Sequence, residues 1–133
     1  MKKLKCYYAH TMLSYGSTIE KDDIMTLEAL GFEVLNPNQK WVQEGCEAHI
    51  ELHGKDKAMD YFKKLIDQCD LIAFRSNPDG TILSGVGFEL KYAIDECKPI
   101  IELPCSLQNR IKDYTFTKRY LIEIGHYKTE DND

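Results

Sequence analysis

Short apolar runs and amphipathic stretches alternate along most of the chain. The runs are rich in aromatic and β-branched residues, which favours buried strands. Between them, apolar residues recur at the period of an amphipathic helix. The predicted strands are residues 4–9, 32–35, 70–74 and 100–103. The predicted helices are residues 18–30, 57–69 and 86–97.

Local signals mark several of these boundaries. Ser17 and Glu20 have the spacing of a capping box, so a helix should begin near Thr18, and Gly31 is the glycine expected just after its end. The sequence Asn-Pro-Asp-Gly at 77–80 predicts a turn.

Two regions have weaker patterns. Residues 37–55 are polar and have no clean period, which predicts a long loop, with a short helix over 44–52 as the alternative. Near the end of the chain, Thr115 is the expected cap of a helix that ends at Ile124. Residues 129–133 are predicted to form a frayed acidic tail.

The order of these elements predicts an α/β fold. We expect a doubly wound, mainly parallel sheet of four to five strands with helices on both faces, formed by one domain over residues 1–128. Sheets of this kind bind ligands outside the carboxyl ends of their strands. A site should therefore draw on residues 10–16, 36–41 and 75–87.

Composition narrows the classes of function. The chain has 133 residues, 43% hydrophobic and 29% charged, with a net charge of −5. These values argue against disorder and against binding of a nucleic-acid polymer, while a single nucleotide needs only local positive potential. No leader and no membrane span is expected, hence no membrane partner. Five cysteines, an odd number, indicate free thiols in a reducing, cytoplasmic compartment.

The stretch with the most chemical content is residues 79–90, where a glycine-bearing loop enters a helix. Gly85 and Gly87 would let a ligand approach the backbone, and Ser84 could cap the helix or bind a phosphate oxygen. Glu89 is expected in the first turn, on the flank of the helix. In the alternative interpretation, Glu89 only complements the helix dipole, and the glycines only allow close packing on the sheet.

Within this stretch, Gly85-Val86-Gly87-Phe88-Glu89-Leu90-x-x-Ala93 resembles the nucleophile motif of the nucleoside 2-deoxyribosyltransferase superfamily, which includes deoxynucleoside 5′-monophosphate N-glycosidases. Lys5-Cys6-Tyr7-Tyr8-Ala9-His10 is similar to the family's first strand, which ends in a site tyrosine. Weaker similarity covers residues 69–73 and 98–101, so the resemblance spans roughly residues 5–104.

The resemblance implies a mechanism. Glu89 would attack the anomeric carbon of a ribosyl or deoxyribosyl group, forming a glycosyl-enzyme ester without a metal or cofactor. Tyr7 matches the family tyrosine that hydrogen-bonds the nucleophile, although packing in the strand is an equally good explanation. Tyr8 points to the other face of the strand and is predicted to lie in the core.

The chain departs from the family pattern at two positions. Phe62 stands where the family has a carboxylate that assists at the base, and Leu83 stands where relatives have aspartate or serine. Asp60 is about 200° around a helix from residue 62, so it is kept only as a candidate for substrate binding. Asp79 is the alternative acid, although an Asp-Gly turn explains it as well.

Other candidates surround the expected site. His10 and Thr11 follow the first strand and should line the pocket, and Tyr15 could stack on a base. Arg75 could bind a phosphate through both of its forks, or it could be a solvated charge.

A few residues invite other interpretations. Cys46, His49 and His53 would share one face of a helix, which is an alternative zinc site, but no metal site is predicted. The basic residues of 110–119 are interspersed with aromatic ones and are predicted to form a solvated face.

Three hypotheses follow. The first is an enzyme that cleaves an N-glycosidic bond of a nucleoside or nucleotide, with hydrolysis favoured over deoxyribosyl transfer. The second is a non-catalytic protein that binds a nucleotide or an ADP-ribose-like signal in the same pocket. The third is a regulatory domain in which Glu89 only stabilises its helix. A homodimer is expected because relatives complete their pockets across a subunit interface.

Overall fold

The computed structural model describes residues 2–104 and 111–128. Its elements, with the two short 3-10 helices named η, are listed here in chain order: β1 (Lys5–Ala9), η1 (Met12–Ser14), α1 (Thr18–Ala29), β2 (Glu33–Leu35), α2 (Lys40–His53), η2 (Lys55–Lys57), α3 (Ala58–Asp67), β3 (Leu71–Arg75), α4 (Ser84–Asp95), β4 (Ile100–Leu103) and α5 (Tyr114–Glu123).

The four strands form one parallel sheet in the order β2-β1-β3-β4. Tyr7, in the middle of β1, is in register with Leu35 of β2 and Ile72 of β3. The next two strands of the chain, β2 and β3, therefore lie on opposite sides of β1. This arrangement creates a switch point at the carboxyl end of β1. The predicted α/β class with a parallel sheet is confirmed.

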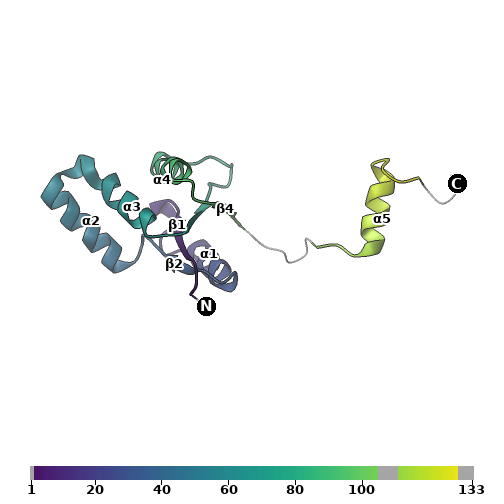
Figure 1. The fold of residues 1–133 in the computed structure, drawn as a ribbon, viewed down its shortest axis with the longest axis horizontal. Helices are drawn as coiled ribbons and strands as arrows, with labels where there is room; N and C mark the ends of the chain where they lie inside the picture. The colour runs from purple at the N-terminus through teal and green to yellow at the C-terminus, as the bar shows by residue number, and fades with distance from the viewer. Residues whose placement is uncertain (1, 105–110, 129–133) are drawn as a thin grey trace.

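Alternation along β1 divides the core in two. Tyr7 and Ala9 face one side, where they pack with residues of α2, α3 and α4. Cys6 and Tyr8 face the other side, where α1 is the helix that packs on them. Figure 1 shows the two layers, with α4 and the α2–α3 pair on one side of the strands and α1 on the other.

The long loop predicted over residues 37–55 was wrong, because most of it forms α2. The short helix considered over 44–52 lies within α2, which is longer at both ends. Val42 is the one buried residue of this helix, so its apolar stripe is too narrow to stand out in the sequence. The helix is positioned by close packing on α3. A Cβ atom on Gly45 would lie 2.1 Å from the hydroxyl oxygen of Tyr61. Gly54, with φ +96°, ends the helix.

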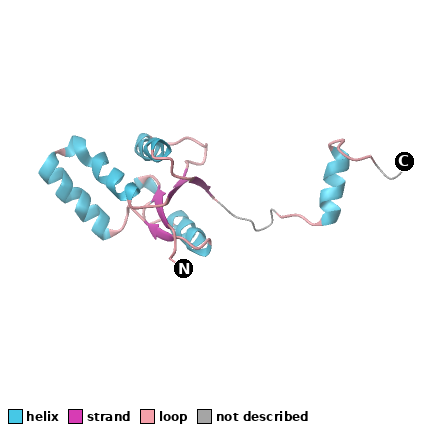
Figure 2. Cartoon of the chain, viewed as in Figure 1, coloured by secondary structure: helices cyan, strands magenta, loops and turns pink. Residues whose placement is uncertain are grey.

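The predicted cap at Thr115 was also wrong. Asp113 caps α5 by accepting a hydrogen bond from the N–H of Phe116 at 2.8 Å, and Thr115 lies inside the helix. Gly125 follows the end of the helix with φ +80°, as expected. Figure 2 shows α5 apart from the sheet and its covering helices. Residues 129–133, the predicted tail, lie outside the described residues.

No helix in the described part of the chain is both long enough and apolar enough to cross a membrane.

Packing at Gly45 gives the first prediction. Gly45→Ala should destabilise the protein by about 1–3 kcal/mol, although alanine favours helices, because the added methyl group overlaps the Tyr61 ring. Urea unfolding measures the difference. Gly85→Ala is the matched control, since a Cβ atom there meets nothing within 4 Å. Equal stability of the two variants would show that α2 and α3 do not need this close approach.

Candidate functional site

A buried pair joins the central strand to α4. The hydroxyl of Tyr7 donates a hydrogen bond to Oε2 of Glu89, and both residues lie in the interior, with Tyr7 fully buried and Glu89 8% exposed. Tyr7 is the one described residue that hydrogen-bonds this carboxylate, and Oε1 has no partner among the described residues. Every buried side-chain oxygen of the described residues has either a hydrogen-bond partner or some contact with solvent. Because Oε1 has no such partner, it remains in contact with solvent.

Burial controls the charge of this pair. It raises the pKa of Glu89 from an ordinary value of 4.5 to about 7, even though the hydrogen bond from Tyr7 opposes the change. Burial, together with the nearby Glu89, raises the pKa of Tyr7 well above its usual value. Tyr7 therefore stays protonated and donates, while Glu89 changes its charge near neutral pH.

The position of Glu89 on α4 differs from the sequence interpretation. The helix begins at Ser84, so Glu89 falls in its second turn, and the first turn holds no acidic residue. A role for Glu89 as a simple complement to the helix dipole is therefore not supported, because that effect fades beyond the first turn. Ser84 is not the cap either, since Leu83 occupies that position without a side-chain cap.

Close packing does not require the two glycines at the start of α4. A Cβ atom on Gly85 would meet nothing within 4 Å, and one on Gly87 would make an ordinary contact of 3.9 Å with Ile82. Neither glycine has a positive φ. Each glycine in a helix costs up to about 1 kcal/mol relative to alanine. The structure thus leaves open surface at the turn of the helix that precedes Glu89.

A second polar cluster lies at the end of β1 on the α1 side. Nε2 of His10 lies 2.7 Å from Oε2 of Glu20, and Asn38 donates to both oxygens of that carboxylate at 3.2 and 3.3 Å. These hydrogen bonds lower the pKa of Glu20 although burial acts in the opposite direction. The His10 ring stacks on Tyr8 with centroids 3.9 Å apart. His10 is thus a buried side chain that holds the carboxylate of Glu20 in place.

The capping box is formed only in part. Ser17 accepts a hydrogen bond from the N–H of Glu20 at 3.3 Å, as predicted. The carboxylate of Glu20 instead turns to His10 and accepts from the N–H of Gly16 at 3.3 Å. A local motif therefore also supplies a tertiary contact.

Tyr15 connects the two clusters. Its ring lies 4.8 Å from the His10 ring. Burial, followed by the negative charges of Glu89 and then Glu20, raises the pKa of Tyr15 to about 12. The partly buried ring of Tyr15 thus lies beside His10, just after the end of β1.

Arg75 belongs to a third polar group. Its Nε and Nη2 donate to the two oxygens of Asp23 at 3.0 and 2.6 Å, and the hydroxyl of Tyr8 donates to the same carboxylate. Asp23 and Asn38 were not singled out in the sequence, and Glu20 was given a capping role alone. The available signal was that the two acids fall on the buried stripe of α1 with Leu27.

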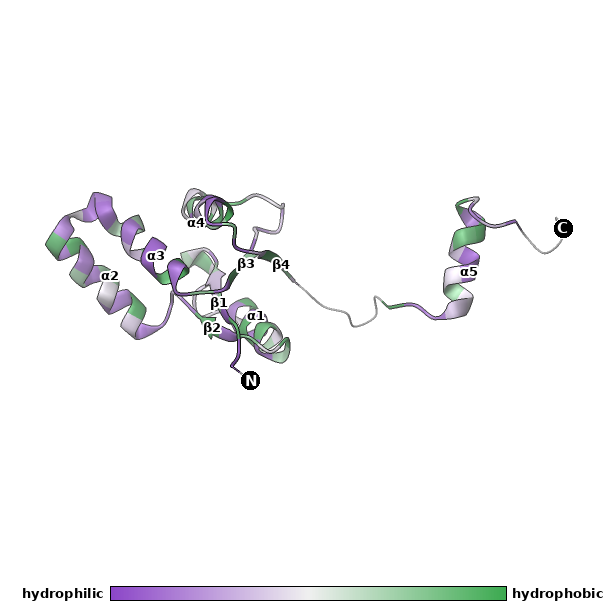
Figure 3. Cartoon of the chain, in the orientation of Figure 1, coloured by the Kyte–Doolittle hydropathy of each residue, from purple (hydrophilic) through white to green (hydrophobic). Residues whose placement is uncertain are grey.

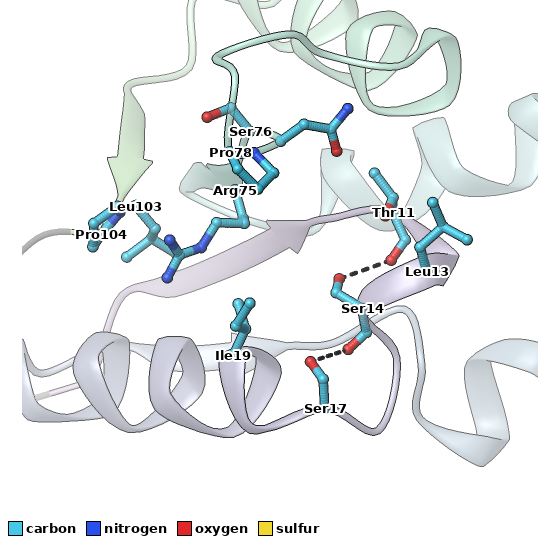
Figure 4. A pocket seen from close by; sticks show the side chains of 11 residues that line it. Thr11, Leu13, Ser14, Ser17, Ile19, Arg75, Ser76, Pro78, Leu103 and Pro104 are labelled. Carbon is cyan, nitrogen blue, oxygen red and sulfur yellow. Dashed lines mark hydrogen bonds between the residues drawn. The ribbon is translucent and has the colours of Figure 1, made fainter.

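A pocket of about 490 Å³ lies on this side of the sheet, and Figure 4 shows the side chains that line it. Thr11 and Arg75 line it, together with Ser14, Ser17 and Leu103. Glu89 and Tyr7 do not line it, because they lie on the opposite face of β1.

The remaining candidates lie in exposed surroundings. Asp79 accepts hydrogen bonds from the N–H and the hydroxyl of Thr81 at 3.0 and 2.6 Å, which lower its pKa and favour the turn interpretation over a general acid. Asp60 lines a groove with His49 and His53. The described residues contain no cluster of three side chains arranged to hold a metal ion.

Comparisons of the sequence with protein-family models and with curated proteins gave no match. The resemblance to the deoxyribosyltransferase superfamily therefore rests on the motif residues themselves.

The glycines of α4 give a prediction about the stability of the protein. Gly85→Ala and Gly87→Ala should each raise the free energy of unfolding by up to about 1 kcal/mol, because alanine favours the helix and its methyl group meets no clash. Urea unfolding of each variant tests this. A loss of stability in either variant would contradict the absence of a packing requirement.

The raised pKa of Glu89 gives a pH prediction. Between pH 4.5 and about 7 the folded protein keeps a proton that the unfolded chain has lost, so the free energy of unfolding falls as pH rises through this range. Glu89→Gln removes this effect while keeping an acceptor for Tyr7. Its stability relative to the wild type should therefore grow by about 3 kcal/mol between pH 4 and pH 8.

Urea unfolding at several pH values checks this trend. Glu96→Gln, at the exposed end of the same helix, is the control and should not reproduce it. A stability difference between Glu89→Gln and wild type that is the same at every pH would rule out a shifted Glu89.

Proposed function

We propose that this protein cleaves the N-glycosidic bond of a nucleoside or nucleotide, with Glu89 as the nucleophile. The observation that carries the proposal is the isolated Tyr7–Glu89 pair at the switch point of the sheet, with Oε2 held by Tyr7 and Oε1 unpartnered among the described residues. A fixed, partly desolvated carboxylate with one oxygen available is what covalent catalysis at an anomeric carbon needs.

The reaction proceeds in two displacements. Oε1 of Glu89 bonds to the anomeric carbon while the C–N bond breaks, and the base leaves with that electron pair and takes a proton from water. Water then attacks the same carbon and passes its proton to the hydroxide left by the first step. The ester bond to Oε1 breaks, its electron pair returns to Glu89, and the free sugar and the carboxylate are released. Transfer to a second base in place of water would give the transferase reaction.

Neighbouring groups suit these steps. Tyr7 remains protonated, so its hydroxyl holds Oε2 in place and stabilises the carboxylate charge that returns when the ester breaks in the second step. Tyr15 follows β1 with a partly buried ring beside His10, and a ring of this kind suits stacking on the leaving base. The open backbone at Gly85 and Gly87 admits the sugar side of the substrate. This chemistry requires no metal and no cofactor.

A binding protein is the second candidate, and specific observations favour it. Phe62 packs against the core at the position where the family carries its base-side carboxylate, and Leu83 occupies the cap of α4. A site lacking both groups could hold a nucleotide or an ADP-ribose-like signal without cleaving it. In that case Glu89→Gln would leave affinity unchanged.

For either candidate we propose a reducing, cytoplasmic setting, because the buried Cys6 and Cys69 are free thiols.

The test is chromatographic detection of free base released from a panel of nucleosides, deoxynucleosides and their 5′-phosphates. Glu89→Gln should reduce release by about 10³-fold or more, because no other described group replaces the nucleophile, and Tyr7→Phe should reduce it less. Release by the wild type should increase from pH 5 to pH 8, as Glu89 ionises with a pKa of about 7.

Glu96→Gln is the matched control on the exposed part of α4 and should retain full activity. Release of base that persists in Glu89→Gln would disprove the assigned nucleophile. Absence of release from every substrate, with ligand-induced thermal stabilisation in both wild type and Glu89→Gln, would establish the binding protein instead.

A further inference from the structure

A buried histidine faces two oxygens that call for hydrogen-bond donors. Nδ1 of His10 lies 3.1 Å from the backbone oxygen of Tyr8, and Nε2 lies 2.7 Å from Oε2 of Glu20. A neutral imidazole carries one N–H, so it could donate to one of these oxygens and would turn a lone pair toward the other. The His10 side chain is fully buried and cannot turn this lone pair to solvent. The arrangement therefore requires two protons, one at each contact.

The second proton belongs to His10, because Glu20 is held as a carboxylate. Asn38 donates to both of its oxygens at 3.2 and 3.3 Å, and the N–H of Gly16 donates to Oε1 at 3.3 Å. Burial acts to raise the pKa of Glu20, but the hydrogen bonds that it accepts lower the pKa overall. An acceptor with this many donors favours its charged form, so the histidine ring next to it is an imidazolium.

The aromatic rings around His10 suit a cationic ring. The Tyr8 ring is stacked on it, with centroids 3.9 Å apart and an angle of 7° between the planes, and the Tyr15 ring lies 4.8 Å away. The faces of aromatic rings attract cations. Burial raises the pKa of both tyrosines, so their hydroxyls stay neutral in the range where a histidine titrates.

The next charges outward from the ring are already balanced. The Tyr8 hydroxyl donates to Asp23, and both forks of the Arg75 guanidinium donate to the same carboxylate. Among the described residues, His10 is the side chain that forms an ion pair with Glu20. The charge of His10 therefore decides whether the buried charge of Glu20 is balanced.

The His10–Glu20 pair joins three segments at the carboxyl edge of the sheet. His10 directly follows β1, Glu20 lies in the first turn of α1, and Asn38 lies between β2 and α2. Figure 3 shows hydrophilic positions along α1 interleaved with hydrophobic ones, and Glu20 is one of the two acids that this helix buries. Thr11 and Ser14, in the loop that begins with His10, line the pocket of about 490 Å³ (Figure 4). The pair thus holds one wall of this pocket in place.

We propose that His10 is an imidazolium in the folded protein and acts as a pH-sensitive latch on the loop over residues 10–17. At lower pH the latch is closed. As the pH rises, Nε2 loses its proton to solvent and its lone pair faces Oε2 of Glu20. The buried carboxylate then lacks a cationic partner, which is costly, so it turns toward solvent and releases Gly16 and Asn38. The latch consists of contacts within the folded chain, so it does not depend on the proposed N-glycosidase activity.

Nuclear magnetic resonance of the full-length, ¹⁵N-labelled protein without substrate measures the protonation of the histidine ring nitrogens. At about pH 7.5, where an unperturbed histidine is mostly neutral, His10 should carry both ring protons. The ring should be neutral by about pH 9. His10→Gln identifies the signals of this ring by their loss, and through-bond assignment identifies them if that variant does not fold.

Glu20→Gln tests the origin of the second proton. The amide of glutamine can donate to Nε2, so His10 then needs one proton, on Nδ1, and should be neutral at about pH 7.5. Glu28→Gln, at an exposed position of the same helix, is the matched control and should leave both ring protons in place. Loss of the second proton in both variants would show that the contact with Glu20 does not hold it.

Hydrogen exchange tests the latch. Protection of the Gly16 amide, which donates to Glu20, should fall by about tenfold or more as His10 becomes neutral. The amide of Gly54, which is hydrogen-bonded at the end of α2, is the reference and should not follow this change. Glu89→Gln should keep the loss of protection at Gly16, although it removes the other side chain that changes its charge near neutral pH.

Three further outcomes would overturn the proposal. A wild-type His10 ring with a single proton at about pH 7.5 would show that the cluster is neutral. A ring that keeps both protons at about pH 9 would be a permanent ion pair and no switch. Unchanged protection of Gly16 while the ring becomes neutral would show that this charge does not hold the loop.

Discussion

Two consecutive tyrosines on the central strand each hold a buried carboxylate, one on either face of the sheet. Tyr7 donates to Glu89 of α4, and Tyr8 donates to Asp23 of α1. The alternation of side chains along a strand imposes this division, because neighbouring residues must point to opposite faces. The central strand therefore ties both helical layers to the sheet through polar contacts that exist only when each layer is correctly placed.

The two carboxylates differ in the partners that balance their negative charge. Asp23 receives both forks of the Arg75 guanidinium in addition to the phenol. Glu89 has a neutral phenol as its one described partner, so burial makes its charge costly and raises its pKa to about 7. The same architecture thus produces a structural ion pair on one face and a group whose charge changes near neutral pH on the other. The two faces of the sheet therefore differ in whether the buried carboxylate has a charged partner.

The polar groups on the Asp23 side are largely satisfied by one another, through Arg75–Asp23 and His10–Glu20. The adjoining pocket is bordered by Leu103, Pro104 and Ile19. The charges on this face of the sheet therefore find their partners within the fold.

The sequence by itself determined the strands, the parallel α/β class, the helix start at Thr18 and the pairing of Tyr7 with Glu89 as an expectation. These depend on periodicity, on local capping and on a motif within a few residues, all of which are readable along the chain. The extent of helix α2 was not predicted, because the helix buries Val42 alone and a stripe that narrow has no clear period. The role of Gly45 was invisible for a related reason, since the Tyr61 side chain that crowds it comes from another helix.

Only the tertiary structure decided how the charges are distributed. Arg75 was interpreted as a phosphate ligand or a solvated charge, and the fold instead brings it to Asp23, 52 residues earlier in the chain. Glu20 was interpreted as a capping residue, and the fold turns its carboxylate to His10. Glu89 was expected in the first turn of its helix, and the fold buries it in the second. The protonation of a carboxylate depends on its desolvation and on the partners that packing supplies, and neither is encoded in the residues next to it.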